Sequence, residues 1–274
     1  MKKVTLTCIL CSSALFSLSN ANAAPYIVNI PLNEIETKFD NVITTTSTSV
    51  LPIQVVAGQN VYEYIDKDGN AATLTVTAPD GSTSKRPFGT YGDMSGSVWG
   101  ISPARKSEDP IPGYYSGLTF TFSSPVNAFG FEVGDWSTCC RGNARPGGIV
   151  DAYGVPATGT GLWISFDGGA ATLPANALTA QDNPGYPFAP SPGTYTNFIG
   201  AIDSTGDFSS ITFFGDGFGE YLVAGGTLRF ASVPLGSVNE GGAVPSVPEP
   251  ETYAMFLAGL AVLGMTARRR KQNK

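Results

Sequence analysis

The carboxylates are the side chains with the widest chemical range in this 274-residue sequence, because it contains no histidine. Without histidine, a protein cannot use Ser-His-Asp or Cys-His nucleophile systems, or histidine-ligated zinc or copper. Paired carboxylates, as in glycoside hydrolases, or a Ser-Lys arrangement would remain. The acids of the central region are Glu132, Asp135, Asp151, Asp167, Asp203, Asp207, Asp216 and Glu220. Most of them stand beside glycine or where we expect strands to end, which is typical of turns, so we expect no catalytic residue.

One acidic segment begins like a calcium-binding loop. Residues 66–70 read Asp-Lys-Asp-Gly-Asn, but an EF-hand needs an acid at its twelfth position, which is Thr77 here. The Asp-Gly pair between two alternating segments instead favours a hairpin turn. Residues 203–216 could hold calcium in another geometry. We therefore expect no cofactor, and calcium is the alternative.

Three aromatic side chains are candidates for carbohydrate contact. Trp136, Tyr153 and Trp163 could form a platform on which sugar rings stack. Aromatic residues on strands more often belong to the core. We favour the core interpretation and keep the platform as the alternative.

The first 23 residues have the three-part layout of a secretory signal peptide. A cationic Met-Lys-Lys start precedes a mostly apolar stretch at residues 4–18, and Ala21 and Ala23 place small side chains where signal peptidase reads them. The apolar stretch is too short and too serine-rich for a permanent anchor. Neither Cys8 nor Cys11 follows the small residue that precedes a lipidated cysteine. We expect the general secretion machinery to export the protein and signal peptidase to cleave it.

The C-terminal region combines a rigid motif, an apolar segment and a basic cluster. Residues 247–251 read Val-Pro-Glu-Pro-Glu, which favours extended backbone because proline fixes φ. The uncharged segment 252–267 would form a single transmembrane helix about 24 Å long, which can span with snorkelling cations and local thinning. The cluster should stay cytoplasmic and leave the body outside. It consists of Arg268, Arg269, Arg270 and Lys271. A plain C-terminal anchor and a helix buried in a soluble core are the alternatives.

This C-terminal order resembles the PEP-CTERM sorting signal. The resemblance rests on the helix, the basic cluster and the motif residues Val247, Pro248, Glu249 and Pro250, and covers residues 248–274. It implies an exosortase, a multi-span membrane cysteine protease, that removes the tail. It also implies a Gram-negative envelope and a setting of exopolysaccharide or biofilm. The strand pattern of residues 119–135, 198–200 and 208–213 resembles the jelly-roll-like bodies found ahead of this tail.

The negative charge of the body excludes polyanionic partners. From Ala24 to Glu249 the chain has 9 basic and 21 acidic side chains, a net charge of −12. Such a body repels nucleic acids and anionic lipids. An acidic polysaccharide would also be repelled unless divalent cations bridged the two.

Cys139 and Cys140 are the cysteines that would remain after signal cleavage. Neighbouring Cα atoms lie about 3.8 Å apart, below the usual disulfide range, so a bond between them would be strained. In an oxidising compartment we still expect oxidation, either as this vicinal bond or as a bond between chains.

The body, residues 24–232, is expected to be an all-β antiparallel sandwich, jelly-roll-like, with no convincing helix. Its glycine, proline, threonine and aromatic content suits short strands joined by turns. Loops are expected at 85–112 and 181–193, a turn at 123–125 and a linker at 233–247. Strands are expected at 26–30, 61–65, 72–77, near 98–99, and at 117–122, 126–136, 149–153, 162–166, 198–202, 208–214, 221–224 and 227–231.

These observations predict an exported, exosortase-processed and non-enzymatic protein of the cell surface or extracellular matrix. Before processing it would sit in the inner membrane with a periplasmic body. The first alternative is a carbohydrate-binding module for exopolysaccharide. The second is a glycan-active hydrolase with paired carboxylates.

Overall fold

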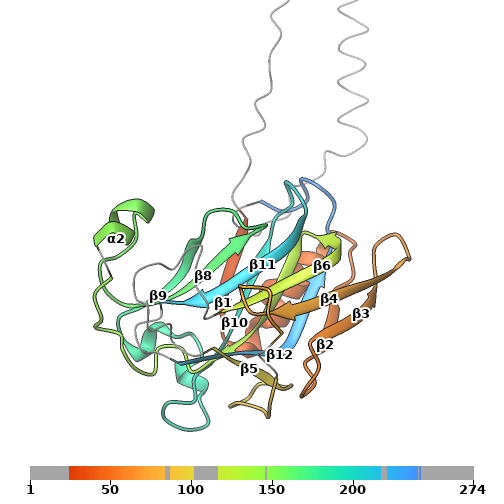
Figure 1. Ribbon diagram of the computed structural model, residues 1–274. Coiled ribbons are helices and arrows are strands. Elements are labelled where there is room, and N and C mark those ends of the chain that lie inside the picture. Colours follow the sequence, from red (N-terminus) through yellow and green to blue (C-terminus); the bar gives the residue numbers. More distant parts are fainter. Residues whose placement is uncertain are drawn as a thin grey trace, which may run out of the picture.

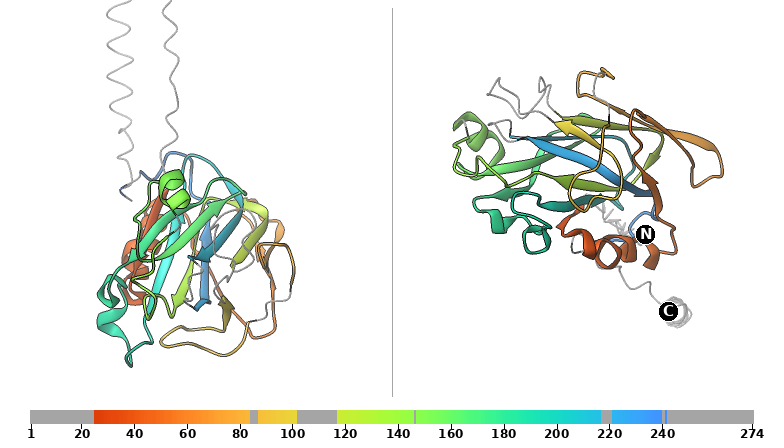
Figure 2. Two further views of the ribbon diagram at one scale, coloured as in Figure 1. Left: turned by 60° about the vertical axis from the view of Figure 1, so that its left-hand side comes forward. Right: turned by 90° about the horizontal axis from the view of Figure 1, so that it is seen from below.

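The computed structural model describes residues 25–83, 87–101, 117–145, 147–216, 221–239 and 241. Within them the chain folds as two antiparallel sheets of six strands each, packed face to face (Figures 1 and 2). The expected all-β antiparallel sandwich is confirmed. The expected signal peptide and C-terminal tail lie outside the described residues.

The first sheet has the order β1-β10-β7-β12-β2, and β5 also pairs with β12. Its strands are β1 (Tyr26–Ile30), β2 (Leu51–Gln54), β5 (Val98–Ile101), β7 (Ala128–Gly134), β10 (Thr196–Ile202) and β12 (Leu222–Ala231). The start of β1, the end of β10, the start of β7 and the end of β12 lie in one register row. This end of the sandwich is called the terminal end, and the opposite end is called the distal end.

The second sheet has the order β3-β4-β6-β11-β8-β9. Its strands are β3 (Val61–Ile65), β4 (Ala71–Thr77), β6 (Leu118–Val126), β8 (Thr160–Phe166), β9 (Thr172–Ala177) and β11 (Phe208–Gly215). The chain passes from one sheet to the other between β2 and β3, at every step from β4 to β8, and at every step from β9 to β12. Double-sheet Greek-key folds share such crossings.

Alternating side chains fill the space between the sheets. Phe129 and Phe131 of β7 project into it and meet the ring of Phe120 from β6 at centroid distances of 4.8 and 4.9 Å. The other face of the first sheet is also covered, by a second cluster that contains Phe39 and Phe198. Their rings lie 4.9 Å apart. Strands β7 and β10 are therefore buried on both faces.

The helical cover of the first sheet was not expected from the sequence. It runs through η1 (Leu32–Glu34), η2 (Glu36–Asp40) and α1 (Asn41–Thr45). Ile35, Phe39 and Ile43 stand four residues apart, and all three are buried against the sheet. That spacing is the helical signal.

Three local predictions were wrong. The expected strand 149–153 lies within the helix α2 (Gly147–Tyr153), because Ile149 and Tyr153, one helical turn apart, both pack against Trp163. The expected turn at 123–125 lies within β6, which continues to Val126. The expected strands 221–224 and 227–231 are a single strand, β12, with an irregularity at Gly225.

The packed body extends further than expected. The linker was expected to begin at Val233, but Val233 and Val238 are buried in the second cluster. Asn127 fixes Val233, donating from Nδ2 to its carbonyl (2.8 Å) and accepting from its N–H (2.6 Å). Ser204 Oγ donates to the carbonyl of Val238 (2.5 Å). The folded body therefore reaches Val238, and any linker begins after it.

Candidate functional site

The residues expected to direct export and sorting lie outside the described part of the chain. They are Ala21, Ala23, Val247, Pro248, Glu249, Pro250, Arg268, Arg269, Arg270 and Lys271. Within the described residues, no helix is both long and apolar enough to cross a membrane.

A disulfide joins Cys139 to Cys140, whose Cα atoms lie 3.8 Å apart. It lies in the loop after β7, with Cys139 exposed and Cys140 half-buried. The loop is compact, and Ser137 Oγ anchors it by donating to the carbonyl of Thr179 (2.8 Å). Of the alternatives left open by the sequence, the structure has the vicinal bond.

The three candidate stacking aromatics do not form one platform. Trp136 is buried in the core between the sheets, and its Nε1 donates to the Thr160 carbonyl (3.2 Å). Trp163 lies in a separate cluster, with the Tyr153 ring 5.6 Å away and edge-on. Both tryptophans are 0 % exposed, so neither indole face is available to a sugar. The core interpretation holds for both.

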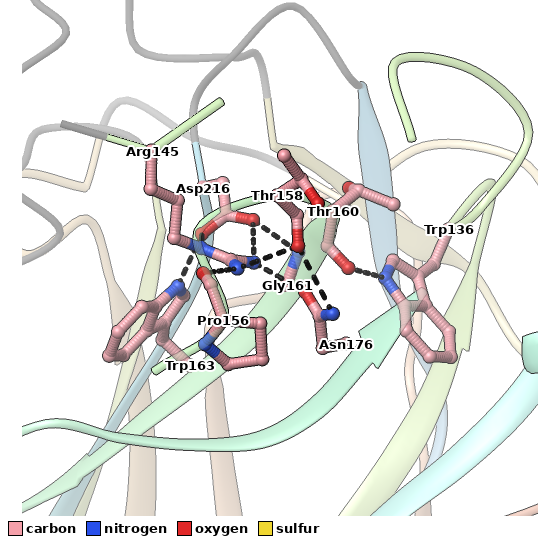
Figure 3. A network of polar contacts seen from close by, with 9 residues as sticks. All are labelled: Trp136, Arg145, Pro156, Thr158, Thr160, Gly161, Trp163, Asn176 and Asp216. Atoms are coloured by element: carbon pink, nitrogen blue, oxygen red, sulfur yellow. Dashed lines mark hydrogen bonds and ion pairs between the residues drawn. The ribbon is translucent and has the colours of Figure 1, made fainter. Parts of the chain in front are cut away.

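The most extensive polar network joins Arg145 to Asp216 (Figure 3). Arg145 Nε donates to Asp216 Oδ1 (3.1 Å) and Nη2 donates to Oδ2 (2.7 Å). The remaining guanidinium hydrogens reach the carbonyls of Pro156 (2.6 Å) and Thr158 (3.2 Å) and Asn176 Oδ1 (2.6 Å). All five N–H donors of the guanidinium are therefore used.

Asp216 is held equally firmly. Beyond the two bonds from Arg145, its Oδ1 accepts from Trp163 Nε1 (2.6 Å), and its Oδ2 accepts from the Gly161 N–H. The network ties the loop before α2 to β8 and β11. Its role is structural, because neither charged group has a hydrogen-bonding position left for a substrate. No sequence pattern indicates that these two residues meet.

Glu132 fills an irregularity in the neighbouring strand. It lies on β7, opposite the point where the register of β12 shifts between Gly225 and Arg229. Its Oε1 accepts from Ser95 Oγ (3.0 Å) and the Thr227 N–H (3.1 Å), and its Oε2 accepts from the Ser95 N–H (3.1 Å). Burial raises its pKa, and the donors from Ser95 and Thr227 oppose that shift. Glu132 thus satisfies backbone groups that the ladder leaves unpaired.

The hydroxyl group of Tyr91 is hydrogen-bonded to Asp135. Tyr91 Oη lies 3.2 Å from Asp135 Oδ1 and 2.9 Å from the Gly193 carbonyl oxygen. Thr138 Oγ1 lies 3.0 Å from the same carboxylate oxygen. Burial raises the pKa of Asp135. Burial also raises the pKa of Tyr91, and the negative charge of Asp135 raises it further.

The single phenolic proton of Tyr91 cannot serve both acceptors at once. When it points to the Gly193 carbonyl, the Tyr91 oxygen can accept a hydrogen bond from a neutral Asp135 carboxyl group.

The remaining candidate acids make turns. Asp66 Oδ1 accepts from the N–H groups of Asp68 (2.9 Å) and Asn70 (2.8 Å), as a hairpin turn requires. Asp167 accepts from two backbone N–H groups and Asp203 from one. Asp151 and Asp207 are exposed, and Glu220 lies outside the described residues. In the described residues no three acidic or cysteine side chains gather as metal ligands.

Two cavities open on the body. One, of about 310 Å³, opens at the terminal end between the β3-β4 hairpin and the end of β12, and is lined by Tyr64, Asp66 and Phe230 among others. The other, of about 320 Å³, lies beside α2 between Tyr153, Pro156 and Leu173. Both are close to the lower size limit for small-molecule sites.

Comparisons with known proteins address the tail directly. Residues 246–271 match the PEP-CTERM protein-sorting motif. Neither the curated proteins nor the solved structures contain a match to this chain. The motif implies export, anchoring in a membrane before cleavage and processing by an exosortase. The chain therefore carries a PEP-CTERM protein-sorting motif, which follows a β-sandwich body.

Proposed function

We propose that the protein is a non-enzymatic component of the cell surface or extracellular matrix, released from its membrane anchor by an exosortase. The sorting motif at residues 246–271 is the observation that carries this proposal. Signal peptidase would act first at Ala23, and the body would then stay on the outer side of the inner membrane until the tail is removed. The proposed matrix is an exopolysaccharide or a biofilm.

The engagement of the acids supports a non-enzymatic role. A glycoside hydrolase needs one free acid and one free carboxylate on either side of a cleft. Glu132, Asp167 and Asp216 instead accept backbone N–H donors, which a structural function already explains. Asp135 Oδ1 instead accepts from two hydroxyl groups, those of Tyr91 and Thr138.

Intact-mass analysis of the exported protein tests the sorting step. In a host with its exosortase, the mature protein should begin at Ala24 and lack residues 252–274. In a host without the exosortase the tail should remain. A Pro248→Ala/Pro250→Ala variant should also keep its tail, whereas Pro245→Ala, outside the matched motif, should be processed normally. A mature protein that retains Lys274 in the exosortase host would contradict the proposal.

A separate assay tests the absence of catalysis. The exported protein is incubated with the host's exopolysaccharide, and reducing sugar is measured over time. We expect no release above a heat-denatured control. Release that disappears in Glu132→Gln or Asp135→Asn would overturn the non-enzymatic role and favour the hydrolase.

A further inference from the structure

Aromatic side chains gather on the outside of the distal end. Phe88 and Tyr186 are 50 % and 37 % exposed, and Tyr221 is 37 % exposed. Tyr91 and Tyr195 are half-buried between them. These five residues are called the aromatic strip. Tyrosine is enriched at interaction sites, because its ring is apolar and its hydroxyl group is polar.

The first half of the strip crosses the edge strand β5. Gly100 of β5 has no side chain, and a Cβ there would overlap the Tyr221 hydroxyl and lie 3.3 Å from Phe88 Cε1. Phe88 itself is fixed by paired backbone hydrogen bonds with Val98, at the start of β5. The glycine thus lets two rings from distant segments meet over one strand.

The second half continues across β7 and β10. A Cβ at Gly134 would lie 2.5 Å from Tyr91 Cδ1, so this glycine makes room for the second ring in the same way. Tyr91 Oη bonds to the Gly193 carbonyl (2.9 Å), and the ring of Tyr195, two residues on, lies 5.2 Å from that of Tyr186. Asp135 directly follows Gly134, the last residue of β7, and its Oδ1 lies 3.2 Å from Tyr91 Oη.

We propose that the aromatic strip binds a neutral polysaccharide. A sugar ring has an apolar C–H face and a rim of hydroxyl groups. Aromatic rings with hydroxyl tips match both, and the Asp135–Tyr91 pair supplies a donor and an acceptor beside them. The net charge of the body, −12 between Ala24 and Glu249, excludes polyanions as the occupant.

The location of the strip fits a polymer outside the cell. Strand pairing puts Tyr221 and Tyr195 at the distal end, because they directly precede Leu222 and Thr196, which lie in the rows of Ile101 and Gly134. The folded body ends at the opposite, terminal end (Figure 1). While the tail is anchored, the strip therefore faces away from its attachment point. The inference rests on the proposed function only in placing the protein outside the cell.

Affinity electrophoresis of the exported protein tests the strip directly. Native gels contain one polysaccharide each: a β-1,3-glucan, a β-1,4-glucan, an α-1,6-glucan, a galactomannan, or alginate as the anionic probe. We expect at least one neutral gel to retard the protein, in 0.5 M NaCl as well as at low salt, and alginate to have no effect. Retardation by none of the neutral polymers, or by alginate alone, would overturn the proposal.

Variants then assign binding to the strip. Phe88→Ala and Tyr186→Ala remove exposed rings from its two ends, and each should weaken binding by about tenfold. Leu235→Ala is the matched control, because Leu235 is 71 % exposed but follows β12 at the terminal end. Thermal unfolding should be unchanged in all three variants. Binding that is equally strong in Phe88→Ala, Tyr186→Ala and the parent would place the site elsewhere and contradict the inference. The intact-mass assay of sorting is independent of this result, so failure of one is distinguishable from failure of the other.

Discussion

Arg145 and Asp216, 71 residues apart in sequence, meet in a two-pronged ion pair whose side chains are 0 % and 3 % exposed. Removing two charges from water is unfavourable, and only good geometry and further hydrogen bonds offset it. Here every polar position of both groups is filled, from Trp163, Gly161, Asn176 and two backbone carbonyls. The pair fixes the loop before α2 onto the second sheet.

Removing one partner of this pair should be severely destabilising. Arg145→Met leaves the Asp216 charge buried and unpaired, and we expect a loss of about 3–5 kcal/mol in the free energy of unfolding. Urea unfolding followed by circular dichroism measures it. Lys67→Met is the matched control, because the Lys67–Asp68 pair is exposed, and its midpoint should not move. The double variant Arg145→Met/Asp216→Leu should recover part of the loss. An unchanged midpoint in Arg145→Met would show that the pair contributes nothing.

Gly226 should tolerate alanine much less well than Gly58. Both glycines have positive φ, +61° and +80°, so alanine costs about 1–2 kcal/mol at either position. A Cβ at Gly226 would also overlap Glu132 Oε2, whereas a Cβ at Gly58 meets no atom within 4 Å. Gly226→Ala should therefore lower the unfolding midpoint clearly more than Gly58→Ala. Equal shifts would mean that Glu132 does not hold the irregularity in β12.

Cys139 and Cys140 should resist alkylation in the exported protein. The disulfide between them leaves no free thiol at either position, and the compartment is oxidising. Iodoacetamide without reductant should leave both unmodified, and prior reduction should make both reactive, as peptide masses would show. Cys139→Ser is the control, because it frees Cys140 for alkylation or for pairing between chains. Two alkylated cysteines in protein collected without reductant would contradict the prediction.

The sequence predicted most strands because their partners are close in the chain or their pattern is regular. The Asp-Gly turn predicts the β3-β4 hairpin, and β6 and β11 alternate clearly. Strands β2 and β9 were missed, because each contains a proline, Pro52 and Pro174, and owes its conformation to pairing with β12 or β8. The helical cover had a readable signal in the spacing of Ile35, Phe39 and Ile43.

The candidate sites were harder to predict, because they depend on residues brought together from distant segments. The carboxylates were identified from the sequence, but their partners were not. Asp216 accepts hydrogen bonds from Arg145, and Glu132 accepts them from Ser95 and Thr227. The aromatic strip has no linear motif, since its members come from three separate loops and are joined only by sheet pairing. The sorting motif is the opposite case, because a protease reads it as a contiguous segment.

The stability of the body should fall as pH rises through the raised pKa of Asp135. Burial favours the neutral carboxyl in the folded state, so between the unfolded pKa, about 4, and the folded pKa, the native state binds more protons than the unfolded state. Stability supplied by the neutral carboxyl is fully present at low pH and is lost over that interval. The groups that face Asp135 are Tyr91, Thr138 and Tyr221. None of them carries a positive charge, and the hydrogen bonds from Thr138 and Tyr91 oppose the effect of burial without cancelling it.

Asp135→Asn should remove this contribution, since the amide stays neutral at every pH. The difference in the free energy of unfolding between variant and parent should therefore move in favour of the variant as pH rises from about 4, and become constant above the folded pKa. Urea unfolding at a series of pH values measures it. Asp68→Asn, at an exposed position, is the control for the loss of one negative charge. A difference curve that is flat, or that moves in favour of the parent as pH rises, would show that Asp135 is not stabilised in its neutral form.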